Sequence, residues 1–91
     1  MLFAILMKVR SATAKERIAR RVQWQYPAGA KMVAEYWLMN PDPQVISIVE
    51  AESAAPILAA IVAWDDVFEF RVYPAMTAEE GLKLAKQMMQ G

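Results

Sequence analysis

The chain of 91 residues fits one domain, residues 1–91, and leaves little room for a second. Hydrophobic residues make up 57% of it, against a usual range of about 45–50%, so this small chain is expected to have a second apolar surface to cover. The formal net charge is zero, and the absence of Cys and His excludes disulfides, Cys-based zinc sites and nucleophiles activated by a histidine.

The N-terminal third predicts a strand followed by a helix. Residues 2–9 form the strand, because seven of the eight are apolar and none favours a turn; the run is too short for a signal peptide or a membrane span. Thr13 and Glu16 have the spacing of a capping box, which opens a helix that runs to about residue 26 and stops at Pro27. Its inward stripe is expected at positions four apart, namely Ala14, Ile18, Val22 and Tyr26.

The rest of the chain predicts a hairpin, a helix, a strand and a last helix. Residues 31–39 and 44–51 are strands joined by a turn at 40–43, where two prolines forbid ladder bonds. Ser53 caps the next helix, and residues 67–73 form the fourth strand. Thr77 and Glu80 have the spacing of a second capping box, which opens the C-terminal helix. The packing side of this helix is expected to comprise Gly81, Leu82, Ala85, Met88 and Met89.

This order, βαββαβα, predicts an α+β, ferredoxin-like βαββαβ fold with an added C-terminal helix. Right-handed crossovers place two helices on one face of a four-stranded antiparallel sheet with strand order 4-1-3-2. The open face is expected to carry Glu35, Trp37 and Met39 from strand two, and Glu69, Arg71 and Tyr73 from strand four. A face this aromatic marks an interface or a ligand cavity, so we expect a homodimer formed through the sheet face.

Three stretches resemble those of one family: residues 21–27, residues 35–37 and residues 72–75. The family comprises short bacterial proteins described as a domain of unknown function. The resemblance covers nearly the whole chain and implies the dimeric α+β barrel superfamily, in which two such sheets pack face to face. That superfamily includes small monooxygenases, muconolactone isomerases, relatives of chlorite dismutase and dye peroxidases, and proteins without known activity. Its haem-binding members use a proximal His that this chain lacks, and no catalytic residue carries over.

The first candidate site lies on the predicted open face, where Glu35 is expected to contact Arg71 of the partner subunit. Such a pair could orient an anionic or phenolic ligand, or it could fix the register between subunits. Ligand-binding candidates are Glu35, Tyr36, Trp37, Asp65, Arg71 and Tyr73.

Two other groups of residues have a structural interpretation as well as a functional one. Trp24 lies among Arg17, Arg20 and Arg21; this basic face could hold an anion, but Arg20 is expected to stack on Trp24. Residues 1–31 carry a net charge of +6 and residues 32–91 one of −6, and a domain without net positive charge does not favour nucleic-acid binding. Residues 64–66, Trp-Asp-Asp, could line a pocket mouth, but adjacent carboxylates are typical of turns and make a poor metal site.

We therefore expect a cytoplasmic homodimer that binds a small hydrophobic molecule in an apolar aromatic cavity, either between sheet and helices or between two sheets. No cofactor, metal, membrane or nucleic-acid partner is expected. The alternative is a cofactor-free monooxygenase- or isomerase-type enzyme for a small hydrophobic aromatic substrate, with Tyr73, Glu35 or Asp65 handling the proton. A pure assembly module, with the sheet face fully packed by its partner, is the third interpretation.

Overall fold

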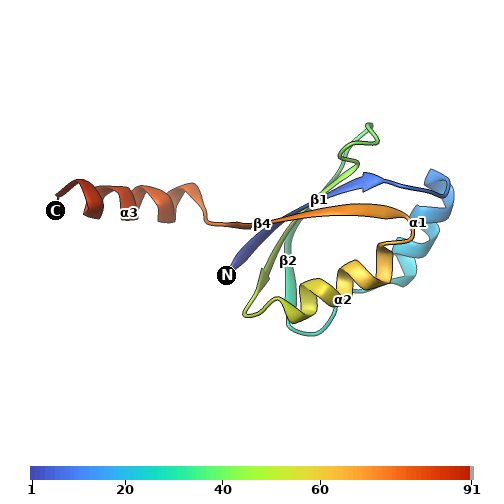
Figure 1. The fold of residues 1–91 in the computed structure, drawn as a ribbon, viewed down its shortest axis with the longest axis horizontal. Coiled ribbons are helices and arrows are strands. Elements are labelled where there is room, and N and C mark those ends of the chain that lie inside the picture. Colours follow the sequence, from blue (N-terminus) through green and yellow to red (C-terminus); the bar gives the residue numbers. More distant parts are fainter. Residues whose placement is uncertain (91) are drawn as a thin grey trace.

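The computed structural model describes residues 1–90, and its elements follow the predicted order (Figure 1). They are β1 (Leu2–Val9), α1 (Ala14–Gln23), β2 (Ala30–Trp37), β3 (Val45–Ala51), α2 (Ala55–Trp64), β4 (Phe68–Ala75) and α3 (Ala78–Gln90). The strands form one antiparallel sheet in the order β2-β3-β1-β4. The ferredoxin-like fold class with an added C-terminal helix is thus confirmed.

The core lies between one face of the sheet and the two crossover helices. Ile5 of β1 and Val49 of β3 are 2% and 0% exposed, and both pack with Ile57 of α2. A second buried cluster joins Val45 of β3 to Trp64 at the end of α2, together with Val67 and Phe68. Apolar side chains at alternate positions of the central strands therefore seal one face, as period-two alternation requires.

Hydroxyl caps fix where two of the helices begin. The Thr13 hydroxyl accepts from the Glu16 N–H at 3.1 Å, and the Glu16 carboxylate accepts in return from the Thr13 N–H, so the first predicted capping box is present. The Thr77 hydroxyl accepts from the Glu80 N–H at 3.0 Å and sets the start of α3. No side-chain hydrogen bond caps α2, whose N-cap position is Ala54 rather than the expected Ser53.

The predicted faces are correct for β4 and wrong for most of β2. In β4, Phe68 is buried towards the helices, whereas Arg71 lies on the opposite, open face. In β2, a bulge between Met32 and Ala34 inserts one extra residue, Val33, and reverses the faces of everything after it. Because side chains alternate with period two, one inserted residue turns Glu35 and Trp37 towards the helices and Tyr36 towards the open face.

The predicted inward stripe of α1 is wrong at Val22, although Tyr26 packs against the core as expected. Val22 is 74% exposed and Ile18 is exposed too, whereas Arg20 and Arg21 on the basic side of α1 are half-buried. The helix ends at Gln23, three residues before the expected end. Two buried or half-buried indole rings lie beneath the basic side and attract its guanidinium groups, which explains why this side faces inwards.

The C-terminal helix does not pack as expected. No residue of α3 is buried, and Figure 1 shows it projecting away from the sheet and from the other two helices. Among residues 1–90, the large apolar side chains of α3, those of Leu82, Leu84, Met88 and Met89, therefore stay exposed.

Candidate functional site

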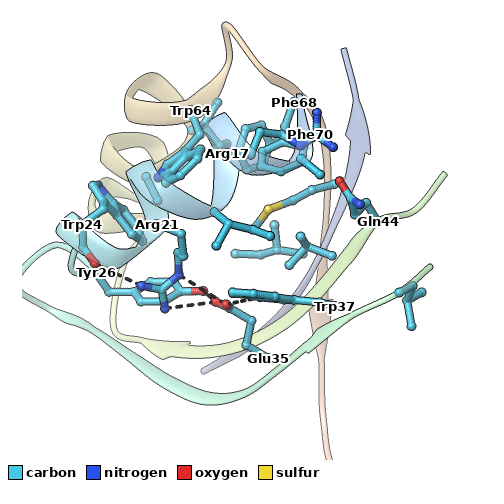
Figure 2. Close-up of a pocket in the computed structure, with 18 of the residues that line it drawn as sticks. Arg17, Arg21, Trp24, Tyr26, Glu35, Trp37, Gln44, Trp64, Phe68 and Phe70 are labelled. Atoms are coloured by element: carbon cyan, nitrogen blue, oxygen red, sulfur yellow. Dashed lines mark hydrogen bonds and ion pairs between the residues drawn. The ribbon is translucent and has the colours of Figure 1, made fainter. Parts of the chain in front are cut away.

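A cavity of about 180 Å³ lies between α1, α2 and the helix-facing side of the sheet (Figure 2). Ile18, Trp37 and Met39 line it and are exposed, so they mark its mouth. The remaining wall is mainly apolar, and Ala60 of α2 with Ile5 of β1 belongs to its floor. Of the two expected locations for a cavity, the monomer therefore has the one between the sheet and the helices.

Aromatic rings form a continuous wall around the cavity. The Trp24 ring centroid lies 4.8 Å from that of Tyr26 and 5.7 Å from that of Trp64, the second contact edge-on. The Trp64 and Phe68 ring centroids are 5.8 Å apart, and the Phe68 and Phe70 rings pack edge-on with their centroids 6.3 Å apart. Tilted and edge-on pairs at these separations are favourable aromatic geometries, so the wall is held by its own packing.

Guanidinium groups lie against two rings of this wall. The Arg20 guanidinium lies 4.6 Å from the Trp64 ring centroid, and that of Arg21 lies 5.6 Å from Trp24. The prediction that Arg20 stacks on Trp24 is therefore wrong, because Arg20 lies on Trp64 and Arg21 lies on Trp24. Arg20 also donates to the Asp66 carboxylate at 2.9 Å, which ties α1 to the end of α2.

Glu35 is the centre of a polar network at one end of the cavity (Figure 2). Its carboxylate accepts from the Tyr26 hydroxyl at 2.5 Å, from Trp37 Nε1 at 2.7 Å and from Arg21 Nε at 3.3 Å. The Tyr26 oxygen also lies 2.7 Å from the hydroxyl of Ser47, which is 0% exposed. Every charged or hydroxyl group of this network thus has a partner within it.

The network fixes the protonation states of its members. Burial alone would raise the pKa of Glu35, but hydrogen bonds from Tyr26, Trp37 and Arg21 outweigh it and hold that pKa below its ordinary value. Burial, followed by the hydrogen bond to the Glu35 carboxylate, raises the pKa of Tyr26 to about 12. At neutral pH Glu35 is therefore a carboxylate and Tyr26 a neutral phenol.

Gln44 supplies a different polar group to the cavity wall. Its backbone is held on both sides, because its N–H donates to the Met7 carbonyl at 2.8 Å and its carbonyl accepts from the Leu38 N–H at 2.7 Å. Its side chain lines the cavity. A fixed backbone with an amide that can donate and accept is suited to orienting a bound molecule.

The six candidate residues of the sequence analysis lie in three separate places. Glu35 and Trp37 line the cavity, whereas Tyr36, Arg71 and Tyr73 lie on the open face. Asp65 lies exposed at the C-terminal end of α2.

The predicted pairing of Glu35 with Arg71 does not fit these positions. Glu35 pairs with Arg21 of its own chain on the helix side of the sheet. Arg71 pairs at 2.6 Å with Asp42, in the turn between β2 and β3. Two residues on opposite faces cannot meet across a sheet-face interface, and the bulge in β2 is the reason.

Several cavity residues were not singled out from the sequence as site residues. The sequence pattern predicts Tyr26 in the packing stripe of a helix and Phe70 on the ordinary core side of a strand. Gln44 offered no pattern at all. The one available signal was the density of aromatic residues at positions expected to face the helices, but that pattern is also typical of a solid core.

The cavity residues do not form a metal site. Within the described residues, no group of three or more His, Cys, Asp or Glu side chains is placed to hold an ion. The cavity carboxylate, Glu35, is already engaged by Arg21. No helix in the described part of the chain has both the length and the apolar character needed to cross a membrane.

Comparison with known proteins identifies the family. A family model described as Domain of unknown function (DUF3303) matches residues 1–89. The chain belongs to this family. A search of curated proteins and a search of solved structures found no match. Membership in the DUF3303 family confirms the expected resemblance to a short domain of unknown function, and it assigns no reaction.

Proposed function

We propose that the protein is a homodimeric small-molecule-binding protein that holds a flat, uncharged, aromatic or similarly apolar ligand in the cavity beneath α1. The aromatic wall of that cavity is the observation that carries this proposal. An engineered apolar cavity of about 150 Å³ binds benzene. A cavity of about 180 Å³ is therefore suited to a molecule of one or two rings.

The electrostatics of the wall support an uncharged ligand. The Glu35 carboxylate and the Arg21 guanidinium neutralise each other, and Tyr26 and Trp37 use their donors on the same carboxylate. A charged ligand would lose its hydration without gaining an unpaired partner at this end of the cavity, which costs free energy. Arg17, which also lines the cavity, already donates to the backbone carbonyls of Ser11 and Ala12. A neutral hydroxyl or carbonyl, in contrast, could hydrogen-bond to the Gln44 amide.

The pKa directions support binding rather than proton transfer. A general acid or base works best when its pKa lies near the operating pH. In the cavity the pKa of Glu35 lies below its ordinary value and that of Tyr26 is raised to about 12, so both move away from neutrality. The enzyme alternative, a cofactor-free monooxygenase or isomerase, gains no support from these two groups.

The homodimer is proposed from the open sheet face. Ile46 and Ile48 of β3 lie there beside Leu6 of β1, with Tyr36 of β2 and Tyr73 of β4 towards its edges. Within the part of the chain that the structure describes, no helix covers this face (Figure 1). A contiguous apolar face of a sheet is typical of an interface. Light scattering at micromolar concentration tests this part of the proposal, and a monomeric mass would contradict it.

Titration with a matched pair of probes tests the ligand site. All three tryptophans of the chain line the cavity, so their indole N–H signals in NMR spectra report on its contents. We expect neutral 2-naphthol to shift these signals in a saturable way and anionic 2-naphthoate to bind at least tenfold more weakly. Equal affinity for both probes would contradict the uncharged character of the site.

Filling the cavity gives the matched variant. Ala60 is buried and lines the cavity, whereas Ala59 is exposed on the other side of the same helix. Ala60→Leu is expected to weaken 2-naphthol binding at least tenfold, because the added carbons occupy the ligand volume. A cooperative thermal unfolding transition would show that this variant is still folded. Ala59→Leu is expected to change the affinity less than twofold. Unchanged binding in folded Ala60→Leu would mean that the probe binds elsewhere.

A further inference from the structure

The C-terminal helix is built like a core helix but touches no core. The apolar residues of α3 fall on one side of a helical projection, and the polar residues fall on the other. The apolar side is Ala78, Gly81, Leu82, Leu84, Ala85, Met88 and Met89. Leu82, Met88 and Met89 are more than two-thirds exposed, and Figure 1 shows α3 leaving the sheet in continuation of β4.

A helix of this length needs outside contacts to be stable. Isolated helices shorter than about 12–15 residues are marginal in water, and most helical stability in proteins comes from packing of an apolar side. The 13 residues of α3 are at this limit, and within residues 1–90 all of them except Gly81 are exposed. The Thr77 cap fixes where the helix begins, but one cap contributes only about 1 kcal/mol.

The size of the exposed surface matches what a dimer would bury. A compact monomer of this mass exposes roughly 5,400 Å². The chain exposes 6415 Å², an excess of about 1,000 Å². Its radius of gyration is 15.3 Å, against about 12 Å for a compact domain of this length. A stable interface buries about 800 Å² on each partner, so the excess is of the size that one dimer interface removes.

We infer that α3 is an exchanged arm: its apolar side, which includes Leu82, Ala85 and Met89, packs against a second copy of this chain. The inference rests on the proposed homodimer and extends it from the open sheet face to the helix beyond the end of β4. A two-fold dimer repeats each contact, so every copy gives its arm to the other and receives one in return.

The charges on α3 favour a second copy over a lipid surface. Helices that lie on anionic membranes are rich in Lys and Arg on the polar side. The polar side of α3 instead balances Glu79 and Glu80 against Lys83 and Lys86. The whole chain is likewise neutral, so neither the helix nor the domain is steered to an anionic surface.

Full-length variants test the arm. Leu82→Glu places a charge on the apolar side of α3 and is expected to raise the dimer dissociation constant, measured by sedimentation equilibrium, at least 30-fold. Gln87→Glu adds the same charge on the polar side of the same helix and is expected to change that constant less than twofold. An equal effect of both variants, or no effect of Leu82→Glu, would overturn the arm.

Mixed labelling shows directly which copy the helix touches. Isotope-filtered NOEs in a mixture of labelled and unlabelled chains are expected to connect methyl groups of Leu82, Met88 and Met89 with protons of the unlabelled copy. NOEs confined to the labelled chain would show α3 folded back on its own sheet and would overturn the exchange. Co-sedimentation of a monomeric chain with vesicles of phosphatidylserine and phosphatidylcholine would overturn it as well.

The sheet face and the arm can fail separately. Ile48→Glu charges the centre of the open face without touching α3. Weakening of the dimer by Ile48→Glu but not by Leu82→Glu keeps the sheet-face dimer and overturns the arm. A wild-type chain that is monomeric at tens of micromolar would contradict both the sheet-face dimer and the arm. Binding of 2-naphthol tests the cavity independently of either.

Discussion

The carboxylate of Glu35 stays ionised among aromatic rings because its neighbours donate to it from three sides. Tyr26, Trp37 and Arg21 place N–H or O–H groups on its two oxygens, and its side chain is only 9% exposed. A buried carboxylate with this many donors is favoured in its charged form. Removing one member would leave others unpaired, so the group acts as a unit that holds β2 against α1 and the segment after it.

This network predicts a loss of stability in acid. The pKa of Glu35 is lower in the folded state than its ordinary value of 4.5, so its contribution is complete above about pH 4.5 and is lost as the pH falls through the folded value. Glu35→Gln is expected to be less stable at pH 7 by about 1–3 kcal/mol, because Arg21 loses a charged partner. It should also show a shallower decline in unfolding free energy between pH 6 and pH 3.

The same logic predicts an alkaline limb from Tyr26. Its folded pKa is raised from 10.0 to about 12, so its contribution is complete below pH 10 and is lost as the pH rises from 10 towards 12. Urea unfolding from pH 3 to pH 11 checks both limbs. Glu52→Gln, in an exposed loop, is the control and should follow the wild-type curve; an acid limb unchanged by Glu35→Gln would contradict the role given to the network.

The order of the elements could be predicted from the sequence because it depends on local signals. Periodicity located each strand, and the pairs Thr13 with Glu16 and Thr77 with Glu80 located two helix starts. The face of each residue was predicted correctly in β4, where alternation is unbroken. What could not be predicted depends on contacts distant in sequence.

Two features that depend on such contacts determine which residues line the cavity. A bulge at Val33 has no sequence signal of its own, since β-branched residues are normal in strands, yet it moves Glu35 and Trp37 to the cavity side. The orientation of α1 is the second case: its apolar stripe through Ile18 and Val22 predicts an inward face. The cation–π contacts of Arg20 and Arg21 could be weighed against that stripe only once the rings beneath the helix were placed.

The bulge makes a sharp prediction about deletions in β2. Deleting Val33 removes the extra residue, so Met32 is followed by Ala34 in a regular ladder and Glu35 keeps its side of the sheet. Deleting Tyr36 also permits a regular ladder, but Glu35 then moves to the open face and leaves Tyr26 and Arg21 without their acceptor. We expect the Val33 deletion to retain 2-naphthol binding within about threefold.

The Tyr36 deletion, in contrast, is expected to lose binding at least tenfold. It should also lower the free energy of unfolding by about 2 kcal/mol or more, because half-buried donors lose their acceptor. Urea unfolding and the probe titration measure both effects in both variants. Equal behaviour of the two deletions would mean that the bulge does not set the face of Glu35.

The two apolar surfaces that the chain leaves uncovered lie on different elements but raise the same question. The chain exposes about 1,000 Å² more than a compact monomer of its mass, and the open sheet face and the apolar side of α3 are both part of its exposed surface. The cavity lies on the other side of the sheet from the open face, so its occupant does not have to change the dimer. Ligand binding and self-association are therefore expected to be thermodynamically independent.

Self-association predicts a melting temperature that depends on protein concentration. If folded chains pair and unfolded chains do not, a hundredfold rise in concentration stabilises the dimer by about 2.7 kcal/mol, which corresponds to a rise of roughly 5–10 °C for chains of this length. Differential scanning calorimetry between about 5 and 500 µM measures this shift in the wild type. Ile48→Glu should melt at nearly the same temperature across that range, because a charge at the centre of the open face prevents pairing while the helix-side core around Ile5 and Val49 is unchanged. A wild-type melting temperature that did not change with concentration would leave the open face of the sheet without its proposed partner.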